Sequence, residues 1–434
     1  MWFLVLGLLL KDAKVTTREE NELLTRTDPG TSMGNYLRSF WIPCMVQSEV
    51  PQSDEPPVRL RLLGEDLVVF RDTNGNIGVL EERCPHRQAS LFFGRNEEAG
   101  LRCVYHGWKF NTAGNCLEMP NEPATSDFKT RVKAVSYPAR LGGGILWVFM
   151  GEQSSIAEFP DFEWMDLPPE KLYVSRWEQE CNSIQAMEGE LDAAHVSFLH
   201  RRVDQIHERK TALSGGYFQE DRSPRWHVKD TDYGFIAASQ RNVEEDKAYW
   251  RLNQFLLPFY TMITSEPGSA RMTRMWVPKD DTHCWVIALN FRHEHELLET
   301  ELSMWRNGEM VHRKVIPGTT QPIETRANDY LIDRDAQRRL TFTGIEGVRA
   351  QDAMATESAG PIVDRTKENL GTSDIAVVRM RRRLMSEAKS LRDSGKVPLP
   401  AKNGKVYRVR AHQTVLSREQ AFDEVDEVSA AMRA

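Results

Sequence analysis

The sequence predicts an α+β protein in which a small all-β domain precedes a larger domain with an antiparallel sheet flanked by helices. Its 434 residues exceed one ordinary domain and indicate two or three. Short apolar, β-branched runs separated by turn residues fill the region from about 40 to 152. A helical segment at 182–200 precedes several strand-like runs. We therefore expect an N-terminal arm at 1–40, the all-β domain at 41–155 and the larger domain at 156–434.

The arm begins with an apolar run from Trp2 to Leu10, which is shorter than the roughly 20 residues that cross a bilayer. No basic residue precedes the run and no small-residue cleavage site follows it, so it is not typical of a signal peptide. We expect the first ~15 residues to reflect a translation start placed too far upstream, with a short membrane-associating tail as the alternative. A helix is expected to start at 17–20. We expect a cytoplasmic protein without a membrane partner.

The strands expected in the two domains share β-branched and aromatic residues bounded by turns. In the all-β domain, Asn74-Gly75 between two such runs predicts a hairpin. Two later stretches, around 349–357 and 374–392, are helical by composition. The expected strands are 58–63, 66–71 and 145–150 in the first domain, and 226–230, 233–239, 249–257, 271–277 and 283–291 in the second.

Composition excludes several classes of protein. Apolar residues make up 40% and charged residues 27% of the chain, which is the balance of a globular protein. The net charge of −7 argues against a general nucleic-acid binder. Six cysteines are too few for a disulfide scaffold and indicate thiols, some of them available as metal ligands.

Two pairs of metal-ligand residues share one pattern. Cys84-Pro-His86 is followed by Cys103-Val-Tyr-His106, so that each pair offers one thiolate and one imidazole on a turn. A Rieske centre needs this set, because one iron of its [2Fe–2S] cluster takes two thiolates and the other takes two imidazoles. A Cys2His2 zinc site is the alternative, but its pairs are normally Cys-Cys and His-His. The other cysteines, Cys44, Cys116, Cys181 and Cys284, have no such pairing and are interpreted as small buried residues.

A second constellation indicates a consumer of electrons, since a carrier alone needs only about 100–150 residues. Asp192-x2-His195-x4-His200 offers two imidazoles and a carboxylate, the ligands of a non-heme iron that keeps positions open for dioxygen. On a straight helix, however, His200 would be turned about 140° from His195. Either the helix is distorted there or the rings converge across its edge. The structural alternative is that the two histidines cap or line a helix.

The segments 84–95 and 103–120 resemble the Rieske domain of aromatic-ring-hydroxylating oxygenases, most closely the branch containing phthalate 4,5-dioxygenase. The likeness continues at 21–43 and 142–152 and covers most of the chain, although members of this branch tend to begin near residue 16.

The resemblance implies roles for the helical segment, whose family pattern N-x2-Q-x2-E-G-x2-D-x2-H-x4-H this chain matches from Asn182 to His200. It implies that His195 and His200 bind the mononuclear iron and that Asn182 and Asp192 serve catalysis. Asp192 would bridge His195 to His106 of a neighbouring subunit, which implies a ring, a trimer or a dimer of trimers. The likeness of 347–374 to the family's C-terminal ligand segment places Asp352 as the third ligand, with Glu357 and Asp364 as alternatives.

The resemblance also implies the activity: the terminal oxygenase of an aromatic-degrading system, which uses O2 and electrons drawn from NAD(P)H by a flavin- and ferredoxin-containing reductase. The expected reaction is cis-dihydroxylation of an aromatic acid, phthalate-like or a substituted benzoate. A monooxygenase that hydroxylates a ring or removes an O- or N-alkyl group is one alternative, and a pure electron-transfer protein is another.

An arginine would suit the substrate's acid group, although each arginine alone is more often a surface residue. The cluster at 380–384 is interpreted as a solvated helix face, with reductase docking as the alternative. The candidate substrate arginines are Arg201, Arg202, Arg209, Arg241 and Arg251, of which Arg202, Arg241 and Arg251 are preferred.

Overall fold

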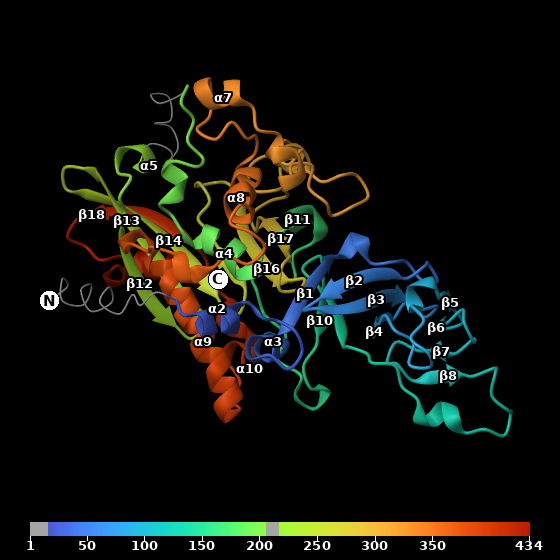
Figure 1. Ribbon diagram of the computed structural model, residues 1–434. Coiled ribbons are helices and arrows are strands. Elements are labelled where there is room, and N and C mark those ends of the chain that lie inside the picture. Colours follow the sequence, from blue (N-terminus) through green and yellow to red (C-terminus); the bar gives the residue numbers. More distant parts are fainter. Residues whose placement is uncertain (1–15, 205–216) are drawn as a thin grey trace.

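The computed structural model describes residues 16–204 and 217–434 (Figure 1). Its N-terminal arm holds two helices, α2 (Arg18–Thr25) and α3 (Ser32–Arg38). The first begins at Thr17, whose hydroxyl accepts a hydrogen bond from the Glu20 amide while the Glu20 carboxylate accepts one from the Thr17 amide. Both helices pack on the long C-terminal helix α9 (Ile375–Ser394), so the arm belongs in space to the larger domain. The expectation for the first fifteen residues falls outside the described part of the chain.

Three small antiparallel sheets make up the all-β domain. The sheet nearest the larger domain pairs β1 with β10 and β10 with β9, and the next is the meander β2-β3-β4. The predicted hairpin joins β3 to β4, where the Asp72 carboxylate accepts hydrogen bonds from the amides of Asn74 and Asn76. The strands are β1 (Trp41–Val46), β2 (Val58–Leu62), β3 (Glu65–Arg71), β4 (Ile77–Glu81), β5 (Arg95–Glu97), β6 (Gly100–Arg102), β7 (Lys109–Phe110), β8 (Cys116–Glu118), β9 (Ala139–Gly142) and β10 (Ile145–Phe149).

One antiparallel sheet forms the larger domain, in the order β11-β17-β16-β15-β14-β13-β12, with β18 also paired to β14. The five predicted strands are present. The sequence patterns missed β11, β15 and β18. The strands are β11 (Leu172–Gln179), β12 (Arg225–Thr231), β13 (Gly234–Glu244), β14 (Lys247–Leu256), β15 (Tyr260–Met262), β16 (Arg271–Pro278), β17 (Cys284–Phe291) and β18 (His412–Ser417).

The two faces of the sheet carry different side chains, as β14 shows. Trp250 and Leu252 pack into an apolar cluster with Phe422, whereas Arg251 and Asn253 alternate with them and are buried on the opposite face. That opposite face therefore carries buried polar side chains.

The helix expected over 182–200 is shorter than predicted. Helix α4 (Ser183–Leu191) ends at Asp192, and a single 3₁₀ turn follows at His195–Ser197. Helix α8 (Val348–Glu357) packs beside α4, and both lie in front of the sheet near the centre of Figure 1. The other helices are α5 (Tyr217–Glu220), α6 (Glu299–Arg306), α7 (Arg334–Arg339), α10 (Leu399–Lys402) and α11 (Asp426–Ala431). Across the ranges described, no helix combines the length and apolar character needed to cross a membrane.

Helix α9 corrects one expectation. The cluster at 380–384 is not simply a solvated face, because Arg381 is buried. Its guanidinium pairs with Glu188 of α4 at 2.7 Å and with Glu368 at 2.6 Å. The pair with Glu188 ties α9 to α4, the helix that leads to the histidines.

Candidate metal sites

The two Cys/His loops have the same backbone hydrogen bonds. In the first, the Gln88 amide donates to the Cys84 carbonyl and the Cys84 amide donates to the Ala89 carbonyl, each at 2.9 Å. In the second, the Gly107 amide donates to the Cys103 carbonyl at 2.9 Å and the Cys103 amide to the Trp108 carbonyl at 2.8 Å. Each loop is thus a closed turn that presents one cysteine and one histidine.

The loops face each other. The imidazole rings of His86 and His106 lie 4.5 Å apart, and His86 stacks on Trp108 at 4.3 Å. Cys84 and Cys103 are buried, are not joined in a disulfide, and interact with each other. Burial, with the second thiol beside it, raises the pKa of Cys84 to about 11. A bound cation would reverse this shift by stabilising the thiolates, so the donor set fits an iron–sulfur cluster.

Gly107 shows why the second loop needs a glycine. Its φ is +78°, in the left-handed region, and a Cβ at this position would lie 2.6 Å from Pro120 Cγ. The turn is therefore held against Pro120 by a close approach that a larger residue would prevent.

Asp192 explains how the chain leaves α4. Its carboxylate accepts a hydrogen bond from the Ala194 amide at 2.7 Å, which replaces a helical hydrogen bond with a local turn. The second carboxylate oxygen lies 3.6 Å from His195 Nδ1. Because the helix stops here, His195 and His200 no longer follow a helical period, and the 140° separation expected on a straight helix disappears.

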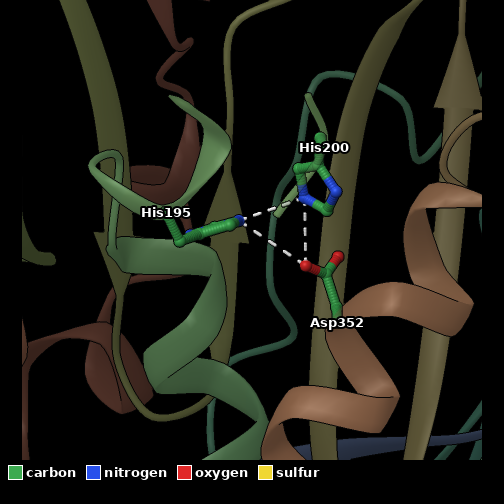
Figure 2. Close-up of side chains that lie close together, drawn as sticks. All are labelled: His195, His200 and Asp352. Atoms are coloured by element: carbon green, nitrogen blue, oxygen red, sulfur yellow. Dashed lines mark hydrogen bonds and ion pairs between the residues drawn. The ribbon is translucent and has the colours of Figure 1, made fainter. Parts of the chain in front are cut away.

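Three ligand atoms converge where the turn meets α8 (Figure 2). His195 Nε2 and His200 Nε2 lie 3.1 Å apart, and Asp352 Oδ1 lies 3.5 Å from the first and 3.1 Å from the second. In the described ranges 16–204 and 217–434, these three residues form a group that could hold a metal ion. Their ligand atoms all lie within 4.8 Å of one another. The three side chains are called the triad below.

The electrostatics of the triad favour a cation. Burial opposes ionisation of Asp352, but His200, Arg349 and His195 hold its pKa well below the ordinary value. Burial likewise lowers the pKa of His195, but Asp192 and Asp352 outweigh it and raise the pKa above the ordinary value. Two imidazole nitrogens that point at one carboxylate oxygen need positive charge between them. Two imidazoles and a carboxylate are also the donor set of non-heme Fe(II) sites, so these residues fit the iron.

Gln351 fixes the orientation of one imidazole. Its side-chain oxygen lies 2.7 Å from His200 Nδ1, and its amide nitrogen donates to the Ile345 carbonyl at 2.8 Å. Since an amide oxygen can only accept, His200 carries its proton on Nδ1 and directs the Nε2 lone pair at the triad.

A cavity of about 1060 Å³ reaches the triad at His195. Its walls include Phe198, Phe342, Ile345 and Met354, which are apolar. Arg326, Asp329 and Arg334 also line it, so apolar and charged side chains share the walls. Apolar walls with a few polar groups are typical of cavities that bind small molecules.

Buried arginines lie on the polar face of the sheet. Arg251 and Arg274 are buried, and the Nε atom of each has no hydrogen-bond partner among the described residues. Burial lowers the pKa of Arg274 to about 9 and also lowers that of Arg251. Glu190, the acid that influences both, is already paired with Arg349 at 2.6 Å.

Several predicted residues have other roles in the structure. Asn182 is the N-cap of α4, and its side-chain amide donates to the carbonyls of Thr25 and Asp281, which gives it a structural role; its catalytic role stays a prediction. Arg241 donates to the carbonyls of Asp221 and Ala193 and thereby supports the Asp192 turn.

Other candidates contribute no ligand atom to the triad. Arg202 is partly exposed and pairs with Asp204 at 2.6 Å, and Arg209 lies outside the described residues. Glu357, an alternative ligand, accepts a hydrogen bond from Tyr330 at 2.6 Å, and Asp364 caps a 3₁₀ turn at the surface.

Sequence reasoning missed Gln351, Arg274, Arg349 and Glu190. A glutamine beside a ligand aspartate carries no distinctive pattern. A buried arginine on a strand is visible only as an interruption of apolar alternation, as at Arg274 in the run 271–277.

Comparisons with known proteins match both parts of the chain. Residues 40–135 match the model described as Rieske [2Fe-2S] domain, and residues 148–432 match LigXa C-terminal domain like. The 3-chlorobenzoate-3,4-dioxygenase oxygenase subunit of Comamonas testosteroni is 37% identical, over 88% of this chain and 90% of that protein. The phthalate 4,5-dioxygenase oxygenase subunit of Pseudomonas putida is 39% identical, over 84% of each.

A solved structure shares the fold. NdmA of Pseudomonas putida CBB5, in a mutant form with theobromine, aligns with a TM-score of 0.58 at 17% identity, over 90% of this chain and 99% of that one.

Proposed function

Because this chain belongs to the Rieske non-heme iron aromatic-ring-hydroxylating oxygenases as an alpha subunit, we propose that it hydroxylates an anionic aromatic acid. As a terminal oxygenase of this family it uses a [2Fe–2S] cluster, a mononuclear iron, O2 and electrons supplied by a reductase. The proposal extends to the residues that hold each group, the substrate and the assembly.

The proposed cluster ligands are Cys84, His86, Cys103 and His106, and the triad would hold the iron. The observation that carries this proposal is the convergence of two imidazole nitrogens and one carboxylate oxygen in a chain that also has a Rieske domain. When bound, the iron supplies the activation of dioxygen, and the cluster supplies electrons one at a time.

The protein's own residues orient the metal ligands and exclude water from the site. Gln351 holds the proton of His200 on Nδ1, and Asp192 lies beside Nδ1 of His195, so both imidazoles keep Nε2 directed at the metal position. The apolar part of the cavity at His195 would hold the substrate ring close to that position and exclude water from it.

The substrate is proposed to be phthalate-like or a substituted benzoate. Two relatives are named for chlorobenzoate and phthalate. On the polar face of the sheet, the buried Nε atoms of Arg251 and Arg274 have no hydrogen-bond partner among the described residues. A buried guanidinium nitrogen without a partner is costly, and a carboxylate would offset that cost with charge-assisted hydrogen bonds. We prefer Arg251 over Arg202 and Arg241 as the predicted anchor because the other two have partners of their own.

We propose a ring of three subunits, or a dimer of such rings. The strands β5 to β8 lie at one end of Figure 1, away from α4 and α8. His106 is partly exposed, and the Asp192 side chain is 27% exposed, so each can meet a partner. In the proposed assembly His106 of one subunit contacts the partner subunit's Asp192, which gives electrons a short path.

Co-production of two inactive variants tests the ring. Cys103→Ser removes the cluster and Asp352→Asn removes the mononuclear iron. If electrons pass between subunits, mixed oligomers regain oxygen uptake, since an intact cluster can lie beside an intact triad. If mixed oligomers stay inactive while both variants fold, the proposed path is wrong.

Oxygen uptake tests the function. The enzyme, a flavin- and ferredoxin-containing reductase and NAD(P)H would be mixed with benzoate, chlorobenzoates or phthalate, at the near-neutral pH of the proposed cytoplasmic location. Uptake stimulated by an aromatic acid supports the substrate class, and its absence with all of them contradicts it. Labelled dioxygen then separates cis-dihydroxylation, which incorporates both oxygen atoms, from the monooxygenase alternative, which incorporates one.

A further inference from the structure

A buried ion pair joins the two helices behind the triad. Arg349 lies in the first turn of α8 and Glu190 in the last turn of α4. Arg349 Nη1 is 2.6 Å from Glu190 Oε2, and the two side chains are only 6% and 3% exposed. Neither the predicted ligands nor the proposed substrate contacts account for this pair.

The same guanidinium nitrogen also reaches the triad. Arg349 Nη1 lies 3.1 Å from Asp352 Oδ2, whereas Asp352 Oδ1 is the oxygen that faces His195 Nε2 and His200 Nε2. The two oxygens of one carboxylate therefore have different partners. One points to the metal position and the other is held by a cation.

We propose that Arg349 is a positioning residue that restricts Asp352 to binding the metal through Oδ1 alone. This inference rests on the proposed assignment of the triad to iron. A carboxylate can bind a metal through one oxygen or through both, and a charge-assisted hydrogen bond to Oδ2 competes with the second mode. Holding Asp352 to one oxygen keeps a coordination position open, which an oxygenase needs.

Glu190 makes this arrangement possible. An arginine beside a divalent cation would be repelled, and a buried guanidinium alone is costly. Glu190 compensates its charge and anchors it at 2.6 Å, which leaves Arg349 unable to move away when the metal binds.

A simpler role would be a structural cross-link between α4 and α8. The chain offers a control for that role, because Arg365 pairs with Glu188 of the same helix α4 at 3.0 Å and is fully buried, although Glu188 also pairs with Arg381. That pair does not contact the triad. A change specific to Arg349 is therefore separable from the loss of a buried ion pair.

The experiment uses full-length protein whose mononuclear site is loaded with cobalt(II), in the wild type, Arg349→Met and Arg365→Met. Arg349→Met alone leaves Glu190 buried without a partner. A double variant, Arg349→Met with Glu190→Met, removes both charges and keeps the space filled. Crystal structures give the distances from both Asp352 oxygens to cobalt, and the cobalt K-edge spectrum gives the coordination in solution. Cobalt titration gives the affinity.

Both Arg349 variants should bring Oδ2 into the coordination sphere and raise the coordination number by about one, while Arg365→Met should match the wild type. Cobalt affinity should change by up to about 100-fold. The proposal is overturned if Oδ2 stays unbound in both Arg349 variants, or if they lose cobalt altogether. Failure of the wild type to bind cobalt at the triad would instead contradict the proposed iron site.

Discussion

The cluster loops and the triad are both candidate metal sites, but they are built in opposite ways. The cluster residues lie between Cys84 and His106, on turns closed by backbone hydrogen bonds. The triad joins His195 and His200 to Asp352, more than 150 residues later, and is held by charged and polar side chains from α4 and α8. A short motif therefore defines the cluster site, whereas the triad depends on the packing of two distant helices.

The two sites should therefore be sensitive to different kinds of substitution. Changes in turn geometry should damage the cluster alone. Changes in the buried charged or polar side chains that contact the triad should damage the triad alone. The predictions that follow test this separation.

Replacing the distant ligand should have the largest effect. Asp352→Asn removes the anionic ligand and should lower oxygen uptake by more than about 100-fold, beyond the usual cost of altering an outer partner. The cluster should still be reduced by the reductase at the wild-type rate, as its absorption spectrum would report. If the cluster is lost as well, the two sites are not independent.

Removing a buried charge near α4 should reduce stability. Glu188→Gln leaves Arg365 without a carboxylate and Arg381 with Glu368 alone, and should cost about 3–5 kcal/mol of unfolding free energy. Burial alone would raise the pKa of Glu188, but Arg365 and Arg381 outweigh it and hold this pKa below its ordinary value of 4.5.

The pH dependence follows from the sign of that shift. A depressed pKa contributes stability that is present above pH 4.5 and is lost as the pH falls through the folded pKa. In Glu188→Gln, this part of the acid-induced loss of unfolding free energy should be absent. Chemical unfolding at several pH values measures the difference. An identical acid limb in both proteins would contradict the assignment.

A change on the polar sheet face should alter substrate affinity without altering the cluster. Arg251→Gln should raise the KM for an aromatic acid by about 10–100-fold, the value of a hydrogen bond to a charged group. Arg202→Gln, at the surface, is the control and should have no effect. Equal effects of the two substitutions would show that Arg251 does not anchor the acid.

The smallest effect is expected in a cluster turn. Gly107→Ala forces a side chain into a left-handed turn and against Pro120, at a cost of about 1–3 kcal/mol. Gly75→Ala is the matched control, because its φ is +84° and no atom lies within 4 Å of the added Cβ. Cluster retention during heating should fall in the first variant only, and the triad should keep its iron in both.

The same contrast explains what could be predicted from the sequence. The α+β fold, the hairpin at Asn74-Gly75 and the main strands followed from local patterns. The pairing of two Cys/His turns also followed from spacing. The convergence of Asp352 with the histidines could not be derived from spacing and was inferred from resemblance alone, because packing of α8 on α4 is a long-range property.

Other features could not be predicted from the sequence, for identifiable reasons. The helix at 182–200 ends early because Asp192 offers its side chain to the Ala194 amide, a competition that helical composition does not reveal. Arg381 is buried because two acids from distant segments surround it. Strand β18 pairs with β14 across more than 150 residues, which a local pattern does not show.

Iron and acid-labile sulfide per chain test the central claim most directly. A chain with a two-iron cluster and a separate mononuclear iron should contain about three irons for every two sulfides. Asp352→Asn should reduce the iron to about two without loss of sulfide. Equal iron and sulfide in the wild type would contradict the account, since the chain would then carry only an electron-transfer cluster.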